Sequence, residues 1–454
     1  MSLMERLEQQ KNLGRPAPSG NGQSKGPVPP AVETDEFAEL KSRVQTEVID
    51  LINRDSSKLR DDDSEKSQFI RNTIESVINI RGADVPRAER AKMVNELYSD
   101  IVGLGPIDPL LADPDISEVM VNGFDHVYVE TKGKIHLTDV KFRDNEHVMN
   151  VINRIVSSVG RRIDESSPMV DARLADGSRV NAIIPPCALS GPTITIRKFS
   201  KTPLTAADLV RFGSVTPQMV TFLEACVKAR LNMVVSGGTG SGKTTLLSVL
   251  SAYIPENERI VTIEDAAELQ LRQEHVITLE SKPANVEGNG AVTIRDLVKN
   301  ALRMRPDRIV VGEVRSGETL DMLQAMNTGH DGSLTTAHAN SPRDLMSRLE
   351  TMVLMSGFEM PVKAIREQIA SALDVVIQQS RLRDGSRKIV SISEVVGMEG
   401  DTITLQDIFV YRPTGFGPDG TKGAFVPTGI RPNFAEKMAD NGVPVKDEWF
   451  LPQG

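Results

Sequence analysis

A glycine-rich segment in the middle of the chain has the residue types and the spacing of a phosphate-binding loop. Its residues are Gly237, Gly238, Thr239, Gly240, Ser241, Gly242, Lys243, Thr244 and Thr245. Glycines let the backbone bend so that several N–H groups face one point, where the N-terminus of the next helix adds partial positive charge. Lys243 can then reach the outer phosphates, and the Thr244 hydroxyl can hold Mg²⁺. Because a strand-like apolar run precedes this segment and an apolar helical pattern follows it, the sequence predicts a nucleoside triphosphate site.

Carboxylates and a histidine lie at or just beyond the ends of three later strand-like runs. The three groups are Glu264, Asp265 and Glu268; Gly312 and Glu313; and Thr335, Thr336, Ala337 and His338. A sheet of parallel strands places its ligand site at the carboxyl ends of those strands. We therefore expect these groups to lie near the bound phosphates.

Each of these groups could take part in hydrolysis of the γ-phosphate. Glu313 ends the apolar run of residues 309–312 and is the best candidate to polarise the attacking water, directly or through the metal shell. Glu264, Asp265 and Glu268 would surround the waters of Mg²⁺. Acidic residues are equally expected at a helix N-terminus because of the helix dipole, so the pattern alone favours neither interpretation. A neutral His338 could contact the γ-phosphate, although a single histidine after a strand more often has a structural role.

From Thr216 onward, strand-like and helical patterns alternate, which is typical of a parallel sheet covered by helices. Two pairs, Thr216-Pro217 and Ser341-Pro342, predict helix starts, because a hydroxyl caps the first turn and proline fits the first helical position. The runs expected to finish this domain as an antiparallel edge are residues 375–379, 388–394 and 403–409. The sequence therefore predicts an α/β fold for the nucleotide-binding part of the chain.

The first half of the chain is predicted to contain a small helical bundle followed by a mixed α+β unit. Apolar residues at helical spacing predict three helices before residue 100. Asn145 is expected to cap a later helix, and residues 132–134 are expected to form a hairpin turn. The predicted organisation is a disordered leader at residues 1–35, the bundle at 36–100, the α+β domain at 101–198, a linker at 199–214, the nucleotide-binding domain at 215–410 and a C-terminal extension at 411–454.

Composition limits the compartment and the partners. The chain has 454 residues and a formal net charge of −9, which argues against a general nucleic-acid binder. Its two cysteines, Cys187 and Cys226, lie beside apolar residues and are expected to be buried, in a reducing compartment. The chain has no apolar run near the roughly 18 residues of a membrane span, and its N-terminus lacks a signal peptide's hydrophobic core. We therefore expect a cytoplasmic protein that reaches a membrane only through partners.

The motifs and their order resemble those of the secretion-superfamily ATPases, and within them the TadA/CpaF motors of Tad (Flp) pili. Residues 263–268 look like the family's aspartate box, residues 303–315 like its Walker B segment, and residues 329–340 like its histidine box. Residues 103–123 are very similar to the stretch that opens the family's N-terminal domain. The resemblance covers about residues 100–410.

This resemblance implies a RecA-like P-loop ATPase domain preceded by an α+β, PAS-like N-terminal domain. It also implies a homo-hexamer at the inner membrane, where platform proteins of a pilus or secretion machine are its partners. ATP and Mg²⁺ would lie between the two domains of a subunit, and Arg179 and Arg197 match the arginines that reach the phosphates. The transferred roles are Lys243 and Thr244 on phosphate and Mg²⁺, Glu268 near the metal, Glu313 as the catalytic carboxylate and His338 as the γ-phosphate sensor.

Two features of the sequence narrow the choice within the superfamily. Gly312 stands where many P-loop enzymes have an aspartate, and two cysteines cannot build the four-cysteine zinc module of type II secretion and type IV pilus assembly ATPases. The missing module favours the Tad or type IV secretion branch, and the helical N-terminal region favours Tad. ATP is preferred to GTP because the chain has no Asn-Lys-x-Asp segment. The alternatives are a type IV secretion ATPase, a nucleic-acid translocase with the same core, and a scaffold that binds ATP but barely hydrolyses it.

Overall fold

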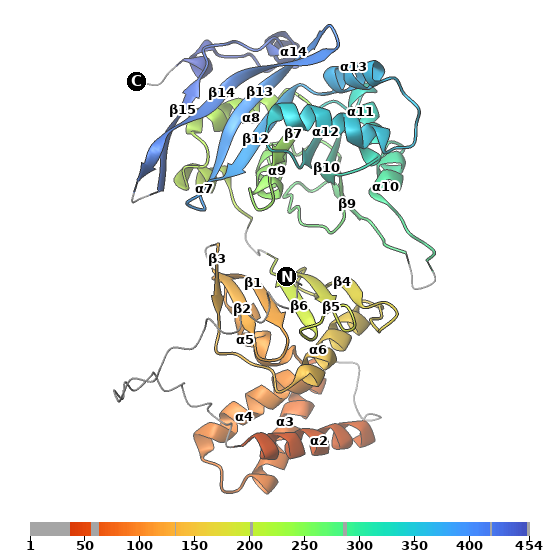
Figure 1. Cartoon of the computed structure of the whole chain (residues 1–454), viewed down its shortest axis with the longest axis vertical. Helices are drawn as coiled ribbons and strands as arrows, with labels where there is room; N and C mark the ends of the chain where they lie inside the picture. Colours follow the sequence, from red (N-terminus) through yellow and green to blue (C-terminus); the bar gives the residue numbers. More distant parts are fainter. Residues whose placement is uncertain are drawn as a thin grey trace, which may run out of the picture. The chain divides into compact units, whose positions relative to one another are not determined.

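The computed structural model describes residues 37–55, 63–131, 133–199, 203–284, 288–417 and 420–451. They belong to two compact units, residues 1–103 and residues 104–454, whose elements are labelled in Figure 1. The predicted leader, residues 1–35, lies outside the described residues.

The first unit contains the three predicted helices. They are α2 (Ala38–Asp55), α3 (Asp63–Arg81) and α4 (Arg87–Ile101). Apolar residues recur every three or four positions, so each helix buries one face. The buried residues of this core are Val44, Val48, Ile74, Val77, Ile78, Val85, Met93, Val94 and Leu97. The three helices therefore form a bundle around one hydrophobic core, as expected.

The second unit begins with an α+β domain built on a six-stranded antiparallel sheet, in the order β3-β2-β1-β6-β5-β4. Its strands are β1 (Ile116–Asn122), β2 (Val127–Thr131), β3 (Lys134–Leu137), β4 (Met169–Arg173), β5 (Arg179–Ile183) and β6 (Thr193–Arg197). A 3-10 turn, η2 (Gly105–Ile107), and helix α5 (Asp108–Ala112) precede the sheet. Helix α6 (Asn145–Ser158) joins the core of the sheet through Val148, Val151, Ile152, Ile155 and Val156.

Two local predictions for this domain have different outcomes. The cap of α6 was predicted one residue too late, because Asp144 and not Asn145 caps the helix. The Asp144 side chain accepts a hydrogen bond from the His147 backbone N–H at 2.7 Å, whereas Asn145 is the first helical residue. Both residue types suit a cap, and only the backbone conformation distinguishes them. The hairpin turn after β2 is confirmed by the pairing of Thr131 with Lys134, although Lys132 itself lies outside the described residues.

The predicted linker at residues 199–214 contains a helix that the sequence interpretation missed. Helix α7 (Ala206–Arg211) begins with a capping box. The Thr205 hydroxyl accepts from the Asp208 backbone N–H, and the Asp208 carboxylate accepts from the Thr205 backbone N–H. Two turns are too short to give a clear apolar period, so the capping pair was the signal available in the sequence.

A nine-stranded sheet forms the part of the chain that is predicted to bind nucleotide, in the order β15-β14-β13-β12-β7-β11-β10-β8-β9. Its strands are β7 (Met233–Gly237), β8 (Ile260–Glu264), β9 (Val276–Glu280), β10 (Arg308–Val314), β11 (Leu334–Ala337), β12 (Val375–Arg381), β13 (Arg387–Glu399), β14 (Thr402–Gly417) and β15 (Gly420–Pro427). The strands from β12 to β9 are parallel, and β13, β14 and β15 extend the sheet in antiparallel fashion. The predicted antiparallel edge is confirmed for β13 and β14, whereas β12 runs parallel to β7.

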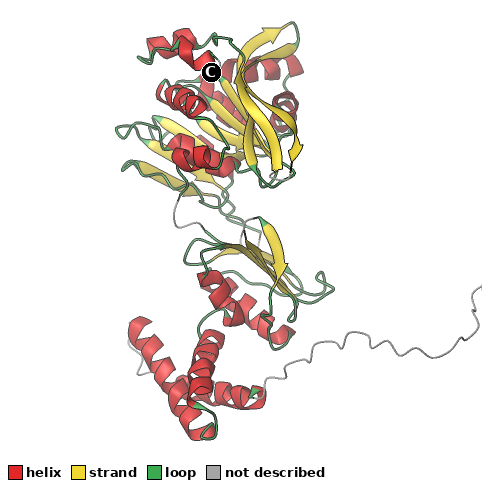
Figure 2. Cartoon of the chain, turned by 90° about the vertical axis from the view of Figure 1, so that its left-hand side faces the viewer, coloured by secondary structure: helices red, strands yellow, loops and turns green. Residues whose placement is uncertain are grey.

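Helices cover both faces of this sheet (Figure 2). One hydrophobic core contains residues of α8 (Pro217–Lys228) and α9 (Lys243–Ser251). The opposite core contains residues of α10 (Ile294–Ala301), α11 (Glu318–Asn327), α12 (Pro342–Leu354) and α13 (Val362–Ala372). Met233 and Val235 of β7 belong to the first core and Val234 to the second, as the alternation of side chains along a strand requires. The predicted caps Thr216 and Ser341 are confirmed at the starts of α8 and α12.

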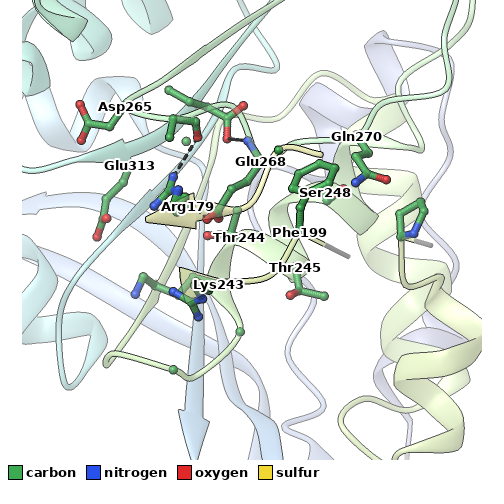
Figure 3. A pocket seen from close by; sticks show the side chains of 18 of the residues that line it. Arg179, Phe199, Lys243, Thr244, Thr245, Ser248, Asp265, Glu268, Gln270 and Glu313 are labelled. Carbon is green, nitrogen blue, oxygen red and sulfur yellow. Dashed lines mark hydrogen bonds and ion pairs between the residues drawn. The ribbon is translucent and has the colours of Figure 1, made fainter. Parts of the chain in front are cut away.

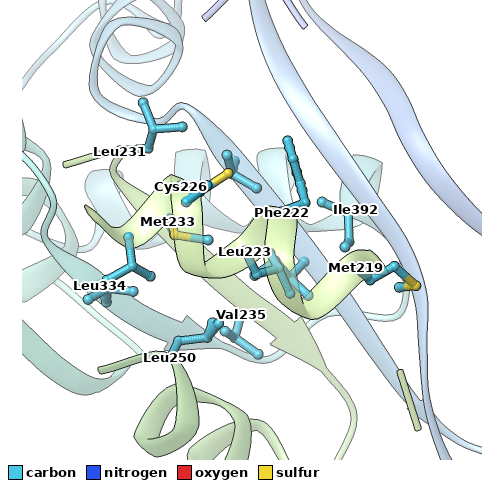
Figure 4. Packing of buried hydrophobic residues seen from close by; sticks show 14 of the residues in the cluster. Met219, Phe222, Leu223, Cys226, Leu231, Met233, Val235, Leu250, Leu334 and Ile392 are labelled. Carbon is cyan, nitrogen blue, oxygen red and sulfur yellow. The ribbon is translucent and has the colours of Figure 1, made fainter. Parts of the chain in front are cut away.

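Helix α8 packs Met219, Phe222, Leu223 and Cys226 into the core of the sheet (Figure 4). The burial expected for Cys226 is confirmed, and this burial raises the pKa of its thiol. Cys187 is exposed, so the prediction for that cysteine was wrong. It lies in the loop between β5 and β6, where apolar neighbours in the sequence do not place a side chain in a core.

The C-terminal extension belongs to the same core as α8. The predicted boundary at residue 410 falls inside β14, and the chain continues through β15 to α14 (Ala435–Asp440) and the 3-10 turn η3 (Asp447–Phe450). The Phe222 ring lies 6.3, 6.2 and 5.7 Å from those of Phe434, Trp449 and Phe450. Sequence separation hid this contact, because apolar side chains more than 200 residues apart meet only in the folded chain.

The expected fold class is confirmed: a helical bundle, an α+β domain and an α/β domain follow one another along the chain. The helices and strands of these domains arise from two spacings of apolar residues. Apolar residues repeat every three or four positions in helices and alternate in half-buried strands. Within the described residues no helix is both long enough and apolar enough to cross a lipid bilayer.

Candidate nucleotide-binding site

The predicted phosphate loop joins β7 to α9. Gly240 and Gly242 have φ angles of 70° and 96°, in the left-handed region that favours glycine. At Gly237 an added Cβ would lie 2.3 Å from the backbone oxygen of Gln379 on β12, so a side chain there would collide with the neighbouring strand. An added Cβ at Gly238 would meet no atom within 4 Å. The loop therefore packs closely against the sheet at Gly237 but has free space beside Gly238. Helix α9 begins where the loop ends, and the backbone N–H groups of its first turn can bind phosphate.

A pocket of about 530 Å³ lies beside this loop (Figure 3). The structure brings most of the predicted site residues into its wall. These are Arg179, Arg197, Thr239, Gly240, Gly242, Lys243, Thr244, Thr245, Glu264, Asp265, Glu268, Glu313 and His338. Gly237, Gly238 and Ser241 are not among the lining residues, and Gly237 and Ser241 are buried within the loop. The parallel strands β7, β8, β10 and β11 all have their carboxyl ends at the same edge of the sheet. Residues that follow these strands therefore share one pocket although they are far apart in the sequence.

Lys243, His338 and Glu313 meet in the wall of the pocket. The Lys243 Nζ lies 3.2 Å from His338 Nε2, and the same ring nitrogen lies 3.1 Å from Glu313 Oε1. Burial, together with the nearby Lys243 charge, lowers the pKa of His338, so the imidazole is neutral at pH 7. Burial also lowers the pKa of Lys243, against the opposing effect of Glu313. A neutral ring donates from one nitrogen and accepts at the other, which suits a contact with phosphate or with water.

Glu264 lies at the end of β8, and its buried side chain hydrogen-bonds to the backbone of the segment that follows this strand. Its side chain accepts hydrogen bonds from the N–H groups of Glu268 at 2.9 Å and of Leu269 at 3.2 Å. Burial raises the pKa of Glu264 to about 7, although both N–H donors oppose the shift. An added Cβ at Gly312 would lie 2.8 Å from Glu264 Cγ. The glycine found where many P-loop enzymes have an aspartate therefore makes room for Glu264.

Two arginines of the α+β domain hold the segment that follows β8. The Arg179 Nε lies 3.0 Å from Glu268 Oε1, and its Nη2 donates to the Ala266 carbonyl at 2.8 Å (Figure 3). Arg173, which faces Arg179 across the β4–β5 pair, donates to the Ala267 carbonyl at 2.9 Å and forms an ion pair with Glu280 at 2.8 Å. The structure thus places Arg179 in the pocket wall, in contact with a carboxylate that the sequence assigned to the metal.

Arg197 also lines the pocket but makes a weaker contact. Its Nε lies 3.4 Å from Glu118 Oε1 on the neighbouring strand β1, and more than half of its side chain is exposed. Glu118 is the register partner of Arg197 in the β1–β6 pair. The guanidinium is therefore held near the pocket by its own sheet and not by the nucleotide-binding domain.

Arg315 is a site residue to which the sequence analysis gave no role. Its guanidinium donates to Glu313 Oε2 through Nε at 2.9 Å and Nη2 at 2.5 Å, and its Nη1 lies 3.4 Å from Asp265. The Ser281 hydroxyl donates to Asp265 Oδ1 at 3.2 Å. Arg315 thus joins the carboxylates that end β10 and follow β8. Its position two residues after Glu313 was the available signal.

The donor set fits Mg²⁺, a hard cation that prefers oxygen ligands and keeps several waters. Thr244 supplies a hydroxyl at the start of α9, and the Asp265 and Glu268 carboxylates lie in the same pocket. Glu268 is paired with Arg179 and Asp265 with Arg315, so neither carboxylate is free of other contacts. This arrangement favours a metal held by Thr244 and phosphate oxygens, with the carboxylates meeting its waters.

Further lining residues gave no signal in the sequence. Phe199 and Gln270 contribute an aromatic ring and an amide to the pocket, and Ser248 lies one turn after Thr244 on α9 (Figure 3). An added Cβ at Gly177 would lie 3.1 Å from the Phe199 ring. Positions of this kind depend on how the domains of the second unit pack, which no local spacing records.

Comparison with known proteins agrees with the motifs. Residues 100–415 match the model of the family described as Type II/IV secretion system protein. A protein of Mycobacterium tuberculosis named provisionally as a conjugal transfer protein is 38% identical over 310 residues, which are 67% of this chain and 88% of that protein. The type IV secretion system protein VirB11 of Brucella abortus is 34% identical over 316 residues, 63% of this chain and 87% of that one.

A solved structure has a similar fold. The pilus retraction motor PilT with bound ADP superposes with a TM-score of 0.50, at 20% identity, over 74% of this chain and 86% of that one. At this identity the likeness concerns the fold alone, and it agrees with the RecA-like core expected for the nucleotide-binding domain.

Proposed function

Because this chain belongs to the Type II/IV secretion system protein family, we propose that it hydrolyses ATP to drive a pilus or secretion machine. The observation that carries the proposal is the meeting of Lys243, His338 and Glu313 within 3.2 Å at the phosphate loop, although Lys243 and His338 lie 95 residues apart. A lysine, a neutral imidazole and a carboxylate at a helix N-terminus supply the groups that γ-phosphate hydrolysis needs.

In this proposal each residue of the pocket has a defined role. Lys243 and the N–H groups of the loop hold the outer phosphates, and Glu313 orients the attacking water, with Arg315 fixing its carboxylate. His338 contacts the γ-phosphate from its place between Lys243 and Glu313. Bound Mg²⁺ would supply positive charge to the phosphate oxygens, with Thr244 as its protein ligand. The remaining carboxylates, Glu264, Asp265 and Glu268, order the pocket wall and its waters.

The arginines of the α+β domain would stabilise charge on the departing phosphate. Arg179 is engaged by Glu268 at 3.0 Å, so phosphate binding by Arg179 requires it to share or exchange that partner. Arg197 reaches the pocket from the neighbouring strand. Losing the terminal phosphate would then change contacts between the two domains and move one against the other.

We propose the Tad (Flp) pilus as the machine and ATP as the preferred nucleotide. Support comes from the motif order, from the two cysteines that cannot form a four-cysteine zinc module, and from the helical unit before residue 103. A type IV secretion ATPase is the second candidate, because the names of the 34% and 38% identical relatives refer to type IV secretion and conjugal transfer. In either case we propose a homo-hexamer at the inner membrane, bound to membrane platform proteins and not to nucleic acid.

The substitution Glu313→Gln tests the catalytic role. It keeps the shape of the side chain but removes the charge that orients water, so steady-state phosphate release should fall by at least about 100-fold while ATP binding persists. Lys243→Ala should lose ATP binding, and exposed Glu359→Gln serves as the matched control. Unchanged turnover in Glu313→Gln would remove this residue from its role. ATP binding without phosphate release by the wild-type chain would indicate a nucleotide-gated scaffold.

A cellular experiment separates the two machines. Cells whose own copy carries Glu313→Gln should lose surface pili if the chain is a Tad motor. Loss of substrate transfer with pili intact would favour the type IV secretion ATPase. Salt-sensitive DNA binding by the purified chain would instead support the nucleic-acid translocase.

A further inference from the structure

The β12–β13 hairpin packs against the phosphate loop. Strand β12 pairs in parallel with β7, and Gln379 is the register partner of Gly237 at the start of the loop. The Gln379 Nε2 lies 3.2 Å from the position that a Cβ would take at Gly242, near the other end of the loop. One strand therefore contacts both ends of the glycine-rich segment.

Arg387, the first residue of β13, holds the middle of the loop. Its Nε donates to the Gly240 carbonyl at 2.9 Å, across 147 residues of sequence. In a loop that binds phosphate through N–H groups, the carbonyls must point elsewhere and find donors. This charged donor fixes the peptide between Gly240 and Ser241, whose N–H donates to the Gly238 carbonyl at 3.3 Å inside the loop.

Arg381, the last residue of β12, contacts the α+β domain. Its Nη2 donates to the Gly133 carbonyl at 3.1 Å, in the turn between β2 and β3. The Arg381 guanidinium also lies beside the phosphate loop, since its Nη1 is 3.6 Å from the position that a Cβ would take at Gly240. Hydrogen bonds to the Gly133 and Gly240 carbonyls hold Arg381 and Arg387, respectively.

The turn that carries the two arginines is itself ordered. Asp384 accepts hydrogen bonds from the Ser386 backbone N–H at 2.9 Å and from the Thr421 backbone N–H of β15 at 2.6 Å. These donors hold the pKa of Asp384 well below its usual value. These hydrogen bonds tie the turn to the start of β13 and to β15, so Arg381 and Arg387 flank one ordered turn.

We propose that this hairpin couples the phosphate loop to the β2–β3 turn. Arg387 is a positioning residue that holds the Gly240 peptide and with it the shape of the phosphate loop, and Arg381 transmits the occupancy of the loop to Gly133. This inference rests on the proposed ATP site and adds a route between the domains that is separate from the Arg179–Glu268 contact.

Nucleotide affinity tests the role of Arg387 in the full-length chain. Arg387→Gln should raise the KM and the dissociation constant for ATP about tenfold, the loss expected for one charge-assisted hydrogen bond, with kcat changed less than about threefold. Arg387→Lys keeps a charged donor but loses the planar guanidinium group. Its dissociation constant for ATP should therefore lie between those of wild type and Arg387→Gln. Exposed Arg383→Gln in the same turn is the matched control and should bind ATP normally. An unchanged dissociation constant in Arg387→Gln overturns the positioning role.

Hydrogen exchange tests the coupling. ATP should change amide exchange across residues 127–137 in the wild-type chain and in Arg383→Gln. Arg381→Gln should bind ATP within about twofold of wild type but lose that change, because one neutral-acceptor bond to Gly133 is removed. A full ATP response of residues 127–137 in Arg381→Gln overturns the coupling alone. Failure of the wild-type chain to bind ATP overturns the proposed function and this inference together.

Discussion

Glu264 is a buried carboxylate whose contacts are hydrogen bonds from backbone N–H groups. It lies at the end of β8, is 3% exposed, and uses its oxygens to hold the N–H groups of Glu268 and Leu269. Its contribution to the site is therefore to fix the segment that carries Glu268 and not to offer a free charge. The sequence could not separate these roles, because both require an acidic residue after a strand.

The raised pKa of Glu264 predicts a specific dependence of stability on pH. The folded value is about 7 and the ordinary value is 4.5, so between them the folded chain keeps a proton that the unfolded chain has released. The free energy of unfolding should therefore fall as pH rises through this window, by about 3 kcal/mol for a shift of this size. Glu264→Gln has no proton to lose and should lack this dependence.

Urea unfolding at pH 5, 6, 7 and 8 measures the difference between the two chains. Wild type should lose stability relative to Glu264→Gln as the pH rises, most steeply near pH 6, between the two pKa values, and only slightly above pH 8. Exposed Glu274→Gln should follow the wild-type curve. Parallel curves for wild type and Glu264→Gln would contradict the buried, protonated state.

The C-terminal turn η3 completes the core over α8. Phe450 is 3% exposed, and its ring lies 5.7 Å from that of Phe222 and 6.5 Å from that of Phe409 on β14. The Gln218 amide of α8 also donates to the carbonyls of Trp449 and Leu451. The segment after β15 is thus fastened to the first helix of the domain by packing and by hydrogen bonds.

Truncating Phe450 should therefore destabilise the nucleotide-binding domain. Phe450→Ala removes a buried ring and leaves a cavity, at a cost of about 3–5 kcal/mol in the free energy of unfolding. Leu451→Ala, one residue later and 58% exposed, should change stability by less than about 0.5 kcal/mol. Thermal unfolding of the two variants provides the measurement. Equal midpoints would show that η3 does not belong to the cooperative core.

Two arginines on the β4–β5 pair link the α+β domain to the nucleotide-binding domain across the pocket. Arg173 holds the Ala267 carbonyl and Glu280, while Arg179 holds the Ala266 carbonyl and Glu268. Each guanidinium therefore joins a carboxylate and a backbone oxygen of the opposite domain. In the proposed motor, phosphate chemistry at the loop and movement between the domains would share these contacts.

Substituting these arginines should separate turnover from folding. Arg173→Gln and Arg179→Gln should each lower kcat about tenfold or more, because they release the segment that carries Glu268. The midpoint of thermal unfolding should stay within a few degrees, since both side chains are partly exposed. Arg162→Gln, in the same domain and paired with Asp164, is the matched control. A normal kcat in both variants would contradict an inter-domain site.

Local spacing predicted the elements and the motifs of this protein. Glycines, lysine and threonine at fixed intervals indicated the phosphate loop, and apolar periods indicated the bundle, the α+β domain and the parallel sheet. Parallel pairing then explains why Glu264, Glu313 and His338 share one edge. The predictions of the helices and strands are confirmed because backbone geometry relates neighbouring residues in the same way in every protein.

Contacts between distant segments required the tertiary structure. Gln379 and Arg387 meet the phosphate loop, Phe450 meets Phe222, and Arg173 meets Ala267, each across more than 90 residues of sequence. The same physics explains the exposure of Cys187, which apolar neighbours in sequence do not prevent. Residue types and intervals determine which local shapes a chain can adopt. The packing of those shapes alone determines which arginine reaches which carbonyl, because burial and distance are properties of the whole folded chain.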